Sequence, residues 1–315
     1  MAIVKNILKK DKIILLSILL ILSSLYAEKQ MLNGYSYEKP TSFQFLRSMP
    51  QDYKDYYNLT VNREYLPEFL LVALSTGLLI AADEKLIVEA KKIGSDLGIA
   101  SDDKTKTFFR VFDLPIRFPT DLGSSLYFIG DGWTHLGLSA GFYMYGKLSD
   151  DNRALQTASQ IAEGMATAGL LTQIIKHITG RVSPYRSEDG HTDKWTPFPN
   201  QIEYHKHVSS YDAFPSGHMA VCMATVTIIA ENYSEYTFIW PAGYTAMTLL
   251  GFQMMNNGVH WISDYPLALA MGYQLGKIAV KNGRKKIDDK VSNFSISPYI
   301  SSSNSIGINL MYNFN

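Results

Sequence analysis

The sequence is poor in cysteine and has no excess of either charge. Its 315 residues include one cysteine, Cys222, which excludes an internal disulfide, and the apolar run around it indicates a buried structural thiol. Lys and Arg together number 29, and so do Asp and Glu. A protein that coats nucleic acid needs a basic excess, so we expect no nucleic-acid partner. No Cys/His cluster has metal-ligand spacing, and we expect neither a metal nor another cofactor.

Hydrophobic residues make up 46% of the chain and charged residues 18%, which argues against disorder. The mean hydropathy of −0.05 is too polar for a chain made mostly of membrane-spanning helices. A chain of this length can bury a substantial core in one domain or two.

The first 27 residues have the pattern of an export segment. Four lysines within the first 12 residues precede an apolar run over 13–27. A secretory signal has an apolar stretch of roughly 7–15 residues, whereas a spanning helix needs about 20. We therefore predict a signal peptide, with cleavage after Ala27. An uncleaved anchor is the alternative, because Leu25 does not suit a small-residue cleavage site. Either way, the expected location is the periplasm or cell envelope.

The rest of the chain predicts an all-α protein. Residues 28–65 are rich in Tyr, Pro, Ser and charges and are interpreted as an irregular leader. Helix-like apolar stretches then define a compact bundle over 66–282. These stretches are 69–82, 124–146, 154–178, 217–230, 237–259 and 264–280. Only 237–259 reaches the length of about 20 residues that a membrane span requires, so membrane contact through it is left open.

The tail over 283–315 changes period. Ile306, Ile308, Leu310, Tyr312 and Phe314 alternate with mostly small or polar residues, and a Ser-rich turn precedes them. Alternation of this kind predicts a short β-hairpin. We expect it to rest on the helical bundle.

The sequence Phe214-Pro215-Ser216-Gly217-His218, followed by an apolar run, carries the strongest chemical signal. Ser216 is a natural N-cap, and Gly217 lets a ligand approach the backbone. The free amides of a helix N-terminus favour an anion, to which His218 could deliver a proton. An ordinary capped helix with an incidental histidine is the alternative.

A second signal is the pair His260 and Asp264. Their i, i+4 spacing places both side chains on one face if a helix begins here. An Asp that accepts the Nδ1 proton fixes the tautomer of the histidine and leaves Nε2 bare, which suits a nucleophile or a base. The alternative is a capping Asp beside a structural His.

A third signal ends the amphipathic stretch over 154–178. Lys176 and Arg181 flank Gly180, which suits a helix C-terminus, and Pro184 suits a stop. The two cations either complement the helix dipole or reach an oxyanion.

In order and type the three segments resemble the type-2 phosphatidate phosphatase/vanadium haloperoxidase superfamily. Its pattern is Lys, six residues, Arg-Pro; then Pro-Ser-Gly-His; then Ser-Arg, five residues, His, three residues, Asp. The matching residues here are Lys176, Pro184, Pro215, Ser216, Gly217, His218, His260 and Asp264. The resemblance covers roughly 66–282 and implies the helical fold of the acid phosphatases and haloperoxidases.

Two arginines of the pattern are missing. Ser183 stands at the first position and Met254 at the second, with Gln253 in place of the preceding serine. In the family both arginines bind phosphate or vanadate oxygens, and each charge-assisted contact is worth about 1.5–3 kcal/mol. Arg181 is the expected substitute. Weaker candidates are Arg186, Asn256 and Asn257.

The resemblance implies a phosphatase acting on a phosphomonoester or diphosphate, either a lipid phosphate or a small molecule. His260 would attack phosphorus to form a phosphohistidine, Asp264 would orient it, and His218 would protonate the leaving oxygen. Lys176, Arg181, Ser216 and Gly217 would bind the phosphate oxygens.

Two other functions compete with hydrolysis. One is a degenerate relative that binds phosphate or a lipid head group without turnover, which the two missing arginines favour. The other is a vanadate-dependent haloperoxidase, which the same losses disfavour. The 185–214 connection is either a substrate-lining lid or a plain solvated loop. We interpret His205 and His207 as solvent-exposed, and leave the place of Asp131 and His135 relative to the site open.

Overall fold

A computed structural model describes residues 31–32, 34–111, 114–188, 194–286, 294–300 and 306–312. The chain divides into two compact units, one formed by the two ends of the chain and the other by residues 39–283. The predicted export segment over 1–27 lies outside the described residues. So does the Ser-rich turn of the tail.

The terminal unit contains short antiparallel strands. β1 (Met31–Leu32), β2 (Tyr35–Ser36) and β5 (Lys285–Lys286) form one small sheet. β6 (Phe294–Ile300) pairs with β7 (Ile306–Tyr312) in a register that runs from Phe294 opposite Tyr312 to Ile300 opposite Ile306. The predicted C-terminal hairpin is therefore confirmed. Its expected packing on the helices stays a prediction.

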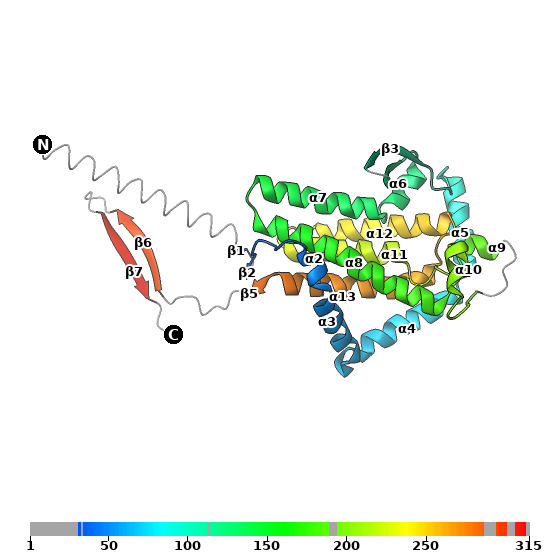
Figure 1. Cartoon of the computed structure of the whole chain (residues 1–315), viewed down its shortest axis with the longest axis horizontal. Coiled ribbons are helices and arrows are strands. Elements are labelled where there is room, and N and C mark those ends of the chain that lie inside the picture. Colours follow the sequence, from blue (N-terminus) through cyan, green and yellow to red (C-terminus); the bar gives the residue numbers. More distant parts are fainter. Residues whose placement is uncertain are drawn as a thin grey trace, which may run out of the picture. The chain divides into compact units, whose positions relative to one another are not determined.

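The unit over 39–283 is a bundle of helices, and the all-α prediction is confirmed (Figure 1). Five long helices, α7, α8, α11, α12 and α13, run roughly parallel or antiparallel to one another, and α11 packs against α8, α12 and α13. The helices are α2 (Gln44–Arg47), α3 (Met49–Val61), α4 (Leu66–Ile80), α5 (Asp83–Asp96), α6 (Leu122–Phe128), α7 (Gly132–Leu148), α8 (Asn152–Thr179), α9 (Pro184–Glu188), α10 (Gln201–Lys206), α11 (Gly217–Asn232), α12 (Ile239–Asn256) and α13 (Tyr265–Gly283).

Local signals account for the ends of α8. Asp151 accepts hydrogen bonds from the backbone N–H groups of Arg153 and Ala154, as an N-cap does. Gly180 ends the helix at φ 57°, in the left-handed region, and a Cβ there would lie 1.9 Å from the carbonyl oxygen of Thr196. The C-terminus predicted at Gly180 is therefore confirmed. It delivers Lys176 to one end of the bundle.

The prediction of an irregular leader over 28–65 is wrong for the part that forms α2 and α3. Pro50 lies in the first turn of α3, where it costs no hydrogen bond. Although α3 is polar in composition, it makes a tertiary contact with α8. Tyr53 donates a hydrogen bond to the backbone carbonyl of Thr167 at 3.0 Å. The compact helical unit accordingly begins near residue 39 and not 66.

The stretch predicted as one helix over 124–146 is two helices, α6 and α7. The break includes Gly130, and Asp131 starts α7 by accepting from the backbone N–H of Trp133 at 2.8 Å. The sequence analysis also missed a β-hairpin between α5 and α6, formed by β3 (Thr105–Val111) and β4 (Leu114–Pro119).

No single helix within the described ranges is both long and apolar enough to cross a membrane, and that includes α12, the helix of the 237–259 stretch. The bent pair Arg63–Ile80 and Asp83–Asp96, with an angle of 69° between its halves, meets the length and composition requirement jointly.

Two buried carboxyl groups join α3 to α8. Asp52 and Glu163 are each 1% exposed and face one another, and Asn282 donates to Asp52 at 2.9 Å. Burial, and then the neighbouring Asp52, raise the pKa of Glu163 to about 10; burial also raises the pKa of Asp52. At neutral pH the pair therefore shares a proton.

This pair predicts that Glu163→Gln stabilises the protein at alkaline pH. In the unfolded chain Glu163 ionises near its ordinary pKa, whereas in the folded chain it keeps its proton until about pH 10. Stability is thus lost as the pH rises between these values. The amide cannot ionise, so we expect a gain of roughly 1–3 kcal/mol at pH 9 and little gain at pH 4. Thermal unfolding at both pH values, with the exposed Glu89→Gln as control, measures it. An equal gain at both would contradict the shared proton.

Candidate active site

Three segments that are distant in sequence meet at one end of the bundle. The C-terminus of α8 brings Lys176, the N-terminus of α11 brings His218, and the segment before α13 brings His260. The backbone N–H of Ser216 donates to the carbonyl of Asp264 at 3.1 Å, which fastens the second segment to the third. The ring centroids of His218 and His260 lie 6.3 Å apart. The three motifs therefore form one site.

His260 and Asp264 make the contact that their spacing predicts. Nδ1 of His260 lies 3.3 Å from Oδ2 of Asp264, and the two side chains are 3% and 0% exposed. The same Oδ2 accepts from the backbone N–H of Trp261 at 2.8 Å. A short 3₁₀ helix, Ile262–Asp264, provides this geometry in place of the expected first turn of an α-helix. The carboxylate can thus hold the Nδ1 proton of His260 and leave Nε2 as the free nitrogen.

The other oxygen of Asp264 binds Arg181. One terminal nitrogen of Arg181 donates to Oδ1 of Asp264 at 2.5 Å and to Ser263 Oγ at 2.7 Å. The second donates to Oδ2 of Asp83 at 2.6 Å. The guanidinium is 1% exposed and lies 4.6 Å from the ring centroid of Trp195.

This environment does not favour the prediction that Arg181 replaces a missing phosphate-binding arginine, which stays a prediction. Both terminal nitrogens are occupied by protein acceptors, and the group is enclosed. The arrangement favours a second role, in which Arg181 positions Asp264 by binding the carboxylate oxygen that does not contact His260.

Lys176 lies in the last turn of α8 and is 5% exposed. Its Nζ is 3.3 Å from Oδ2 of Asp212, a residue that the sequence analysis did not single out. An anion that enters the site must share the lysine with this carboxylate or displace it.

Ser216 caps α11 as predicted. Its Oγ accepts from the backbone N–H of Met219 at 3.3 Å, and the side chain is fully buried. The Oγ also lies 3.6 Å from Sδ of Met254, so the residue at the second missing-arginine position does face this site. Gly217 begins α11, and its free amide is part of the anion-attracting N-terminus.

His218 is half-buried in the first turn of α11. Its ring centroid lies 4.8 Å from that of Tyr127, and a Cβ at Gly130 would lie 2.8 Å from the Cβ of His218. Burial, and then the nearby His260 and Lys176, lower the pKa of His218 to about 3. Without a ligand His218 is therefore neutral at ordinary pH, and it needs an anion beside it to hold a proton.

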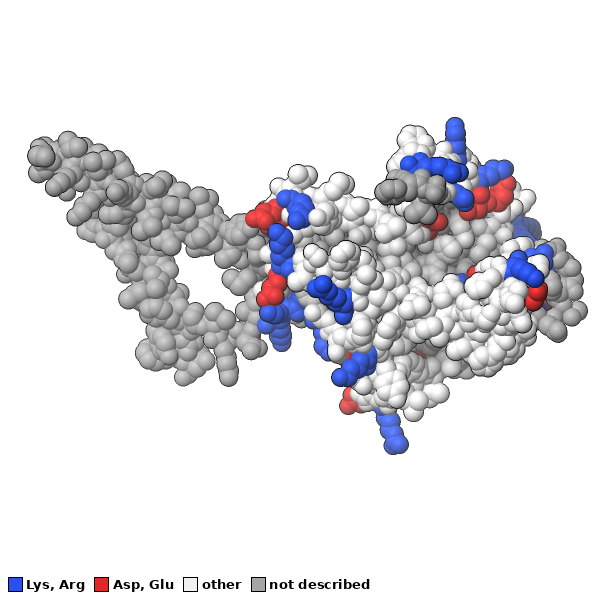
Figure 2. Space-filling view, in the orientation of Figure 1, with Lys and Arg blue, Asp and Glu red and all other residues white. Residues whose placement is uncertain are grey.

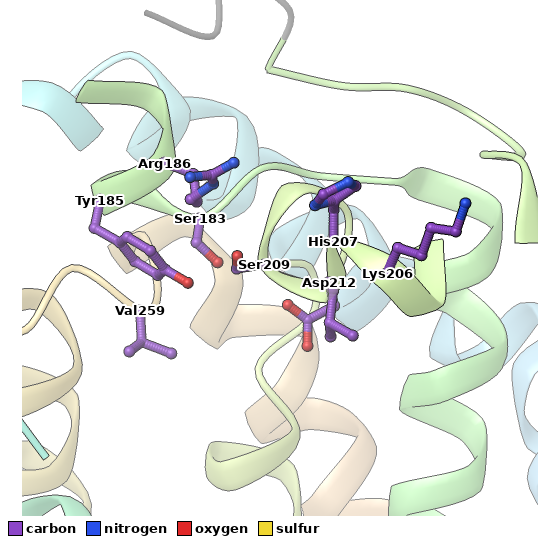
Figure 3. Close-up of a pocket in the computed structure, with 9 residues that line it drawn as sticks. Ser183, Tyr185, Arg186, Lys206, His207, Ser209, Asp212 and Val259 are labelled. Carbon is purple, nitrogen blue, oxygen red and sulfur yellow. The ribbon is translucent and has the colours of Figure 1, made fainter. Parts of the chain in front are cut away.

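A cavity of about 590 Å³ opens beside these residues (Figure 3). Its lining includes Val259, the residue before His260, and Asp212, the partner of Lys176. Ser183, at the first missing-arginine position, faces the same space, as do Ser209 and Tyr185. Three basic side chains, Arg186, Lys206 and His207, also line it.

The remaining candidates are placed as follows. Arg186 lines the cavity, whereas Asn256 is 1% exposed and its amide nitrogen contacts the carbonyls of Ile99 and Ala100 at 3.4 and 3.3 Å. His135 is 2% exposed, and burial lowers its pKa to about 4; it lies near enough to lower the pKa of His218 further. Asp131 serves as the N-cap of α7.

Sequence reasoning missed Asp83, Ser263, Asp212 and Tyr127. Asp83 ends an apolar stretch, but no spacing connects it to Arg181, which is 98 residues away. Within the described ranges, no group of three or more His, Cys, Asp or Glu side chains is arranged to hold a metal ion.

The helical bundle gathers two histidines, a buried lysine and a helix N-terminus, which are groups whose chemistry suits an oxyanion. Comparison with known families is more specific: residues 157–288 match the model described as the PAP2 superfamily. This range contains all three motifs, and the resemblance stated from them is confirmed.

Two solved structures are similar to the chain at 16% identity each. One is LpxE from Aquifex aeolicus, with a TM-score of 0.38, over 50% of this chain and 83% of that one. The other is a transmembrane PAP2-type phosphatidylglycerolphosphate phosphatase from Bacillus subtilis, with a TM-score of 0.42, over 74% of this chain and 98% of that one. No curated protein matches the chain significantly.

Proposed function

We propose that the protein is a phosphatase that hydrolyses a phosphomonoester or diphosphate, with a lipid phosphate as the favoured substrate. The observation that carries this proposal is the His260–Asp264 contact next to His218, at the N-terminus of α11. The carboxylate can fix the tautomer of His260 and leave Nε2 free, and a second histidine lies close enough to contact the same ligand. The family match over 157–288 supports the same reaction class.

In the proposed reaction Nε2 of His260 attacks phosphorus, and the bond from phosphorus to the leaving oxygen breaks. His218 gives its proton to that oxygen. Neutral His218 then takes a proton from a water molecule, which attacks the phosphohistidine and releases inorganic phosphate and His260. Lys176, Ser216 and the Gly217 amide bind the other phosphate oxygens as their charge shifts.

His218 must gain its proton from or with the substrate, because it is neutral in the empty site. Bound phosphate supplies negative charge, which favours the protonated imidazole. A phosphate monoester loses its second proton near pH 6 and carries that proton only below this value. The proposed mechanism is therefore favoured at mildly acidic pH.

The test is phosphate release from an aryl phosphate and from a lipid phosphate by the purified full chain. We expect activity that falls as the pH rises above about 6. We expect His218→Ala to slow the transfer of phosphate to His260, measured by rapid-quench labelling, by roughly 10²–10⁴-fold for alkyl phosphates and much less for aryl phosphates with good leaving groups, because only the former need protonation in that step. Equal losses on both substrates would contradict its role as the acid.

A catalytically degenerate phosphate or head-group binder is the second candidate. Ser183 and Met254 favour it, because both positions bring uncharged side chains to the site. Binding of inorganic phosphate without release from either substrate would support this function over the first.

Restoring an arginine at Ser183 and restoring one at Met254 should give different results. Ser183 is 2% exposed but lines the 590 Å³ cavity, so an arginine there can extend into the cavity, and Ser183→Arg should tighten inhibition by phosphate or vanadate by roughly 10-fold for one charge-assisted contact. Met254 is fully buried, so Met254→Arg should lower the melting temperature unless phosphate is present. Inhibition constants and thermal unfolding with and without phosphate measure both. Unchanged inhibition by vanadate in Ser183→Arg would show that the cavity does not adjoin the bound anion.

We also propose that the protein works at a membrane surface in the periplasm or cell envelope. Large apolar side chains are exposed along α4 and α7, and Figure 2 shows that the charged residues on this face form separate clusters with a broad uncharged area between them. The exposed leucines of α4 are Leu66, Leu70, Leu71, Leu74 and Leu78. Such contiguous apolar surface is typical of contact with lipid or with a partner.

A further inference from the structure

The hairpin β3–β4, between α5 and α6, is not part of a larger sheet within the described residues. It is a two-stranded antiparallel sheet with a register shift between Thr107 and Phe109, and it pairs with no other strand in the described part of the chain. Two strands alone are marginally stable in water, so such a hairpin usually packs against another surface.

Aromatic rings are exposed on this hairpin. Phe108 is 77% exposed, Phe109 51% and Phe118 49%. The ring of Phe108 contacts the other two, with centroid distances of 6.1 Å to Phe109 and 5.8 Å to Phe118. A single exposed apolar side chain is ordinary, but three clustered phenylalanines form a patch that favours burial.

The two strands that carry this patch also carry exposed cations. Lys106, Arg110 and Arg117 are exposed, and the strands Thr105–Val111 and Leu114–Pro119 contain no acidic residue. Beyond the strands, Lys104 is paired with Asp102 at 2.8 Å, and the charge of Arg117 acts on Asp103, where it opposes the rise in pKa that burial of that carboxyl causes. Exposed aromatic rings beside the cations of these strands are complementary to an interface that is apolar beneath a negatively charged surface.

A series of ring contacts connects the patch to the active site. Phe118 stacks on Phe128 of α6, with centroids 6.4 Å apart. Tyr127, which precedes Phe128 in the chain, contacts His218, and the centroids of these two rings lie 4.8 Å apart. An element that held the Phe108 patch in lipid would therefore hold the site close to the lipid surface.

We propose that the β3–β4 hairpin is an interfacial anchor, which inserts the Phe108 patch into a bilayer that carries anionic lipids. Its cations bind the headgroups, and its aromatic rings enter the region of the first acyl carbons. That this brings the site to a lipid substrate rests on the proposed function. The binding of the hairpin to lipid does not.

The single buried cysteine makes a direct test available. Phe108→Cys adds one accessible thiol to a chain whose other thiol, Cys222, is buried. An environment-sensitive fluorophore on this thiol is compared in the full chain in detergent, in phosphatidylcholine vesicles and in vesicles that also contain phosphatidylglycerol. We expect a blue shift, and quenching by lipid-attached quenchers, that are strongest with phosphatidylglycerol.

The matched control is Phe198→Cys, since Phe198 is 75% exposed but lies outside the hairpin. A label at position 108 that is quenched no more than one at 198 would overturn the proposal. So would a blue shift that depends on protein concentration in detergent without lipid, because the hairpin edge would then pair with a second copy of the chain.

A second arm removes the cations by the triple change Lys106→Gln, Arg110→Gln and Arg117→Gln. The quenching in phosphatidylglycerol vesicles should weaken, and hydrolysis of a lipid phosphate in those vesicles should fall by roughly fivefold for each cation removed. Hydrolysis of an aryl phosphate in detergent should be unchanged. If the wild type hydrolyses neither substrate, the proposed function fails while the quenching measurement still decides the hairpin. An unchanged quenching signal in the triple variant would refute the headgroup contact.

Discussion

Replacing His260 by alanine is expected to abolish phosphate release and to leave no phosphorylated protein. The reason is that His260 supplies the nitrogen that bonds to phosphorus in the proposed reaction, with the carboxylate of Asp264 against its Nδ1. Rapid-quench labelling with a radioactive substrate, under conditions that preserve acid-labile phosphohistidine, measures both effects. Full turnover in His260→Ala would refute the mechanism.

Two variants provide the comparison for His260. Asp264→Asn keeps a side chain of the same size but favours the wrong tautomer of His260, and such changes lower rates by roughly 10⁴-fold in other enzymes. His205→Ala removes an exposed histidine near the cavity and should leave the rate unchanged. A merely structural His260 would instead show a loss of about 1–3 kcal/mol in stability with ligand binding intact.

Arg181→Ala is expected to abolish activity and also to destabilise the fold. Removal of the guanidinium leaves Asp83 and Asp264 buried without their cation, and breaking a buried pair in this way costs about 3–5 kcal/mol. The melting temperature and the rate of phosphate release should therefore fall together. Arg186→Ala, on the cavity lining, should have a mild effect on activity and almost none on stability.

Asp83→Asn distinguishes the two roles considered for Arg181. If Arg181 positions Asp264, loosening its second partner should lower kcat with little change in KM. If Arg181 instead binds phosphate, releasing it from Asp83 should tighten inhibition by phosphate and spare kcat. The second result would restore the role that the sequence alone suggested.

The helices were largely predictable because their signals are local. Apolar spacing, the Ser216 cap and Gly180 determine where α8 and α11 begin or end, and each signal acts over a few residues. α3 was missed because its surface is polar, and its stability depends on contacts such as that of Tyr53 with α8. The β3–β4 hairpin was missed because aromatic and basic residues intermix there without clean alternation.

The site was predictable only as far as its motifs extend. The spacing of His260 and Asp264 gave their contact, since both lie within one short segment. The ion-pair partner of Arg181 was not predictable. Asp83 lies in α5, and no local pattern encodes an ion pair across 98 positions. For the same reason Asp212, which holds Lys176, became visible only once the chain was folded.

The pairing of Lys176 with Asp212 has a consequence for the release of product. The formal charges of the two buried cations, Lys176 and Arg181, are exceeded by those of Asp83, Asp212 and Asp264, which contact them. Free phosphate must therefore compete with a resident carboxylate for Lys176, and the basic side chains nearby lie on the cavity and not at this lysine. A substrate that brings additional binding energy through a lipid tail can overcome this competition, whereas the inorganic product cannot. In the proposed reaction this competition would favour rapid release of phosphate after each turnover.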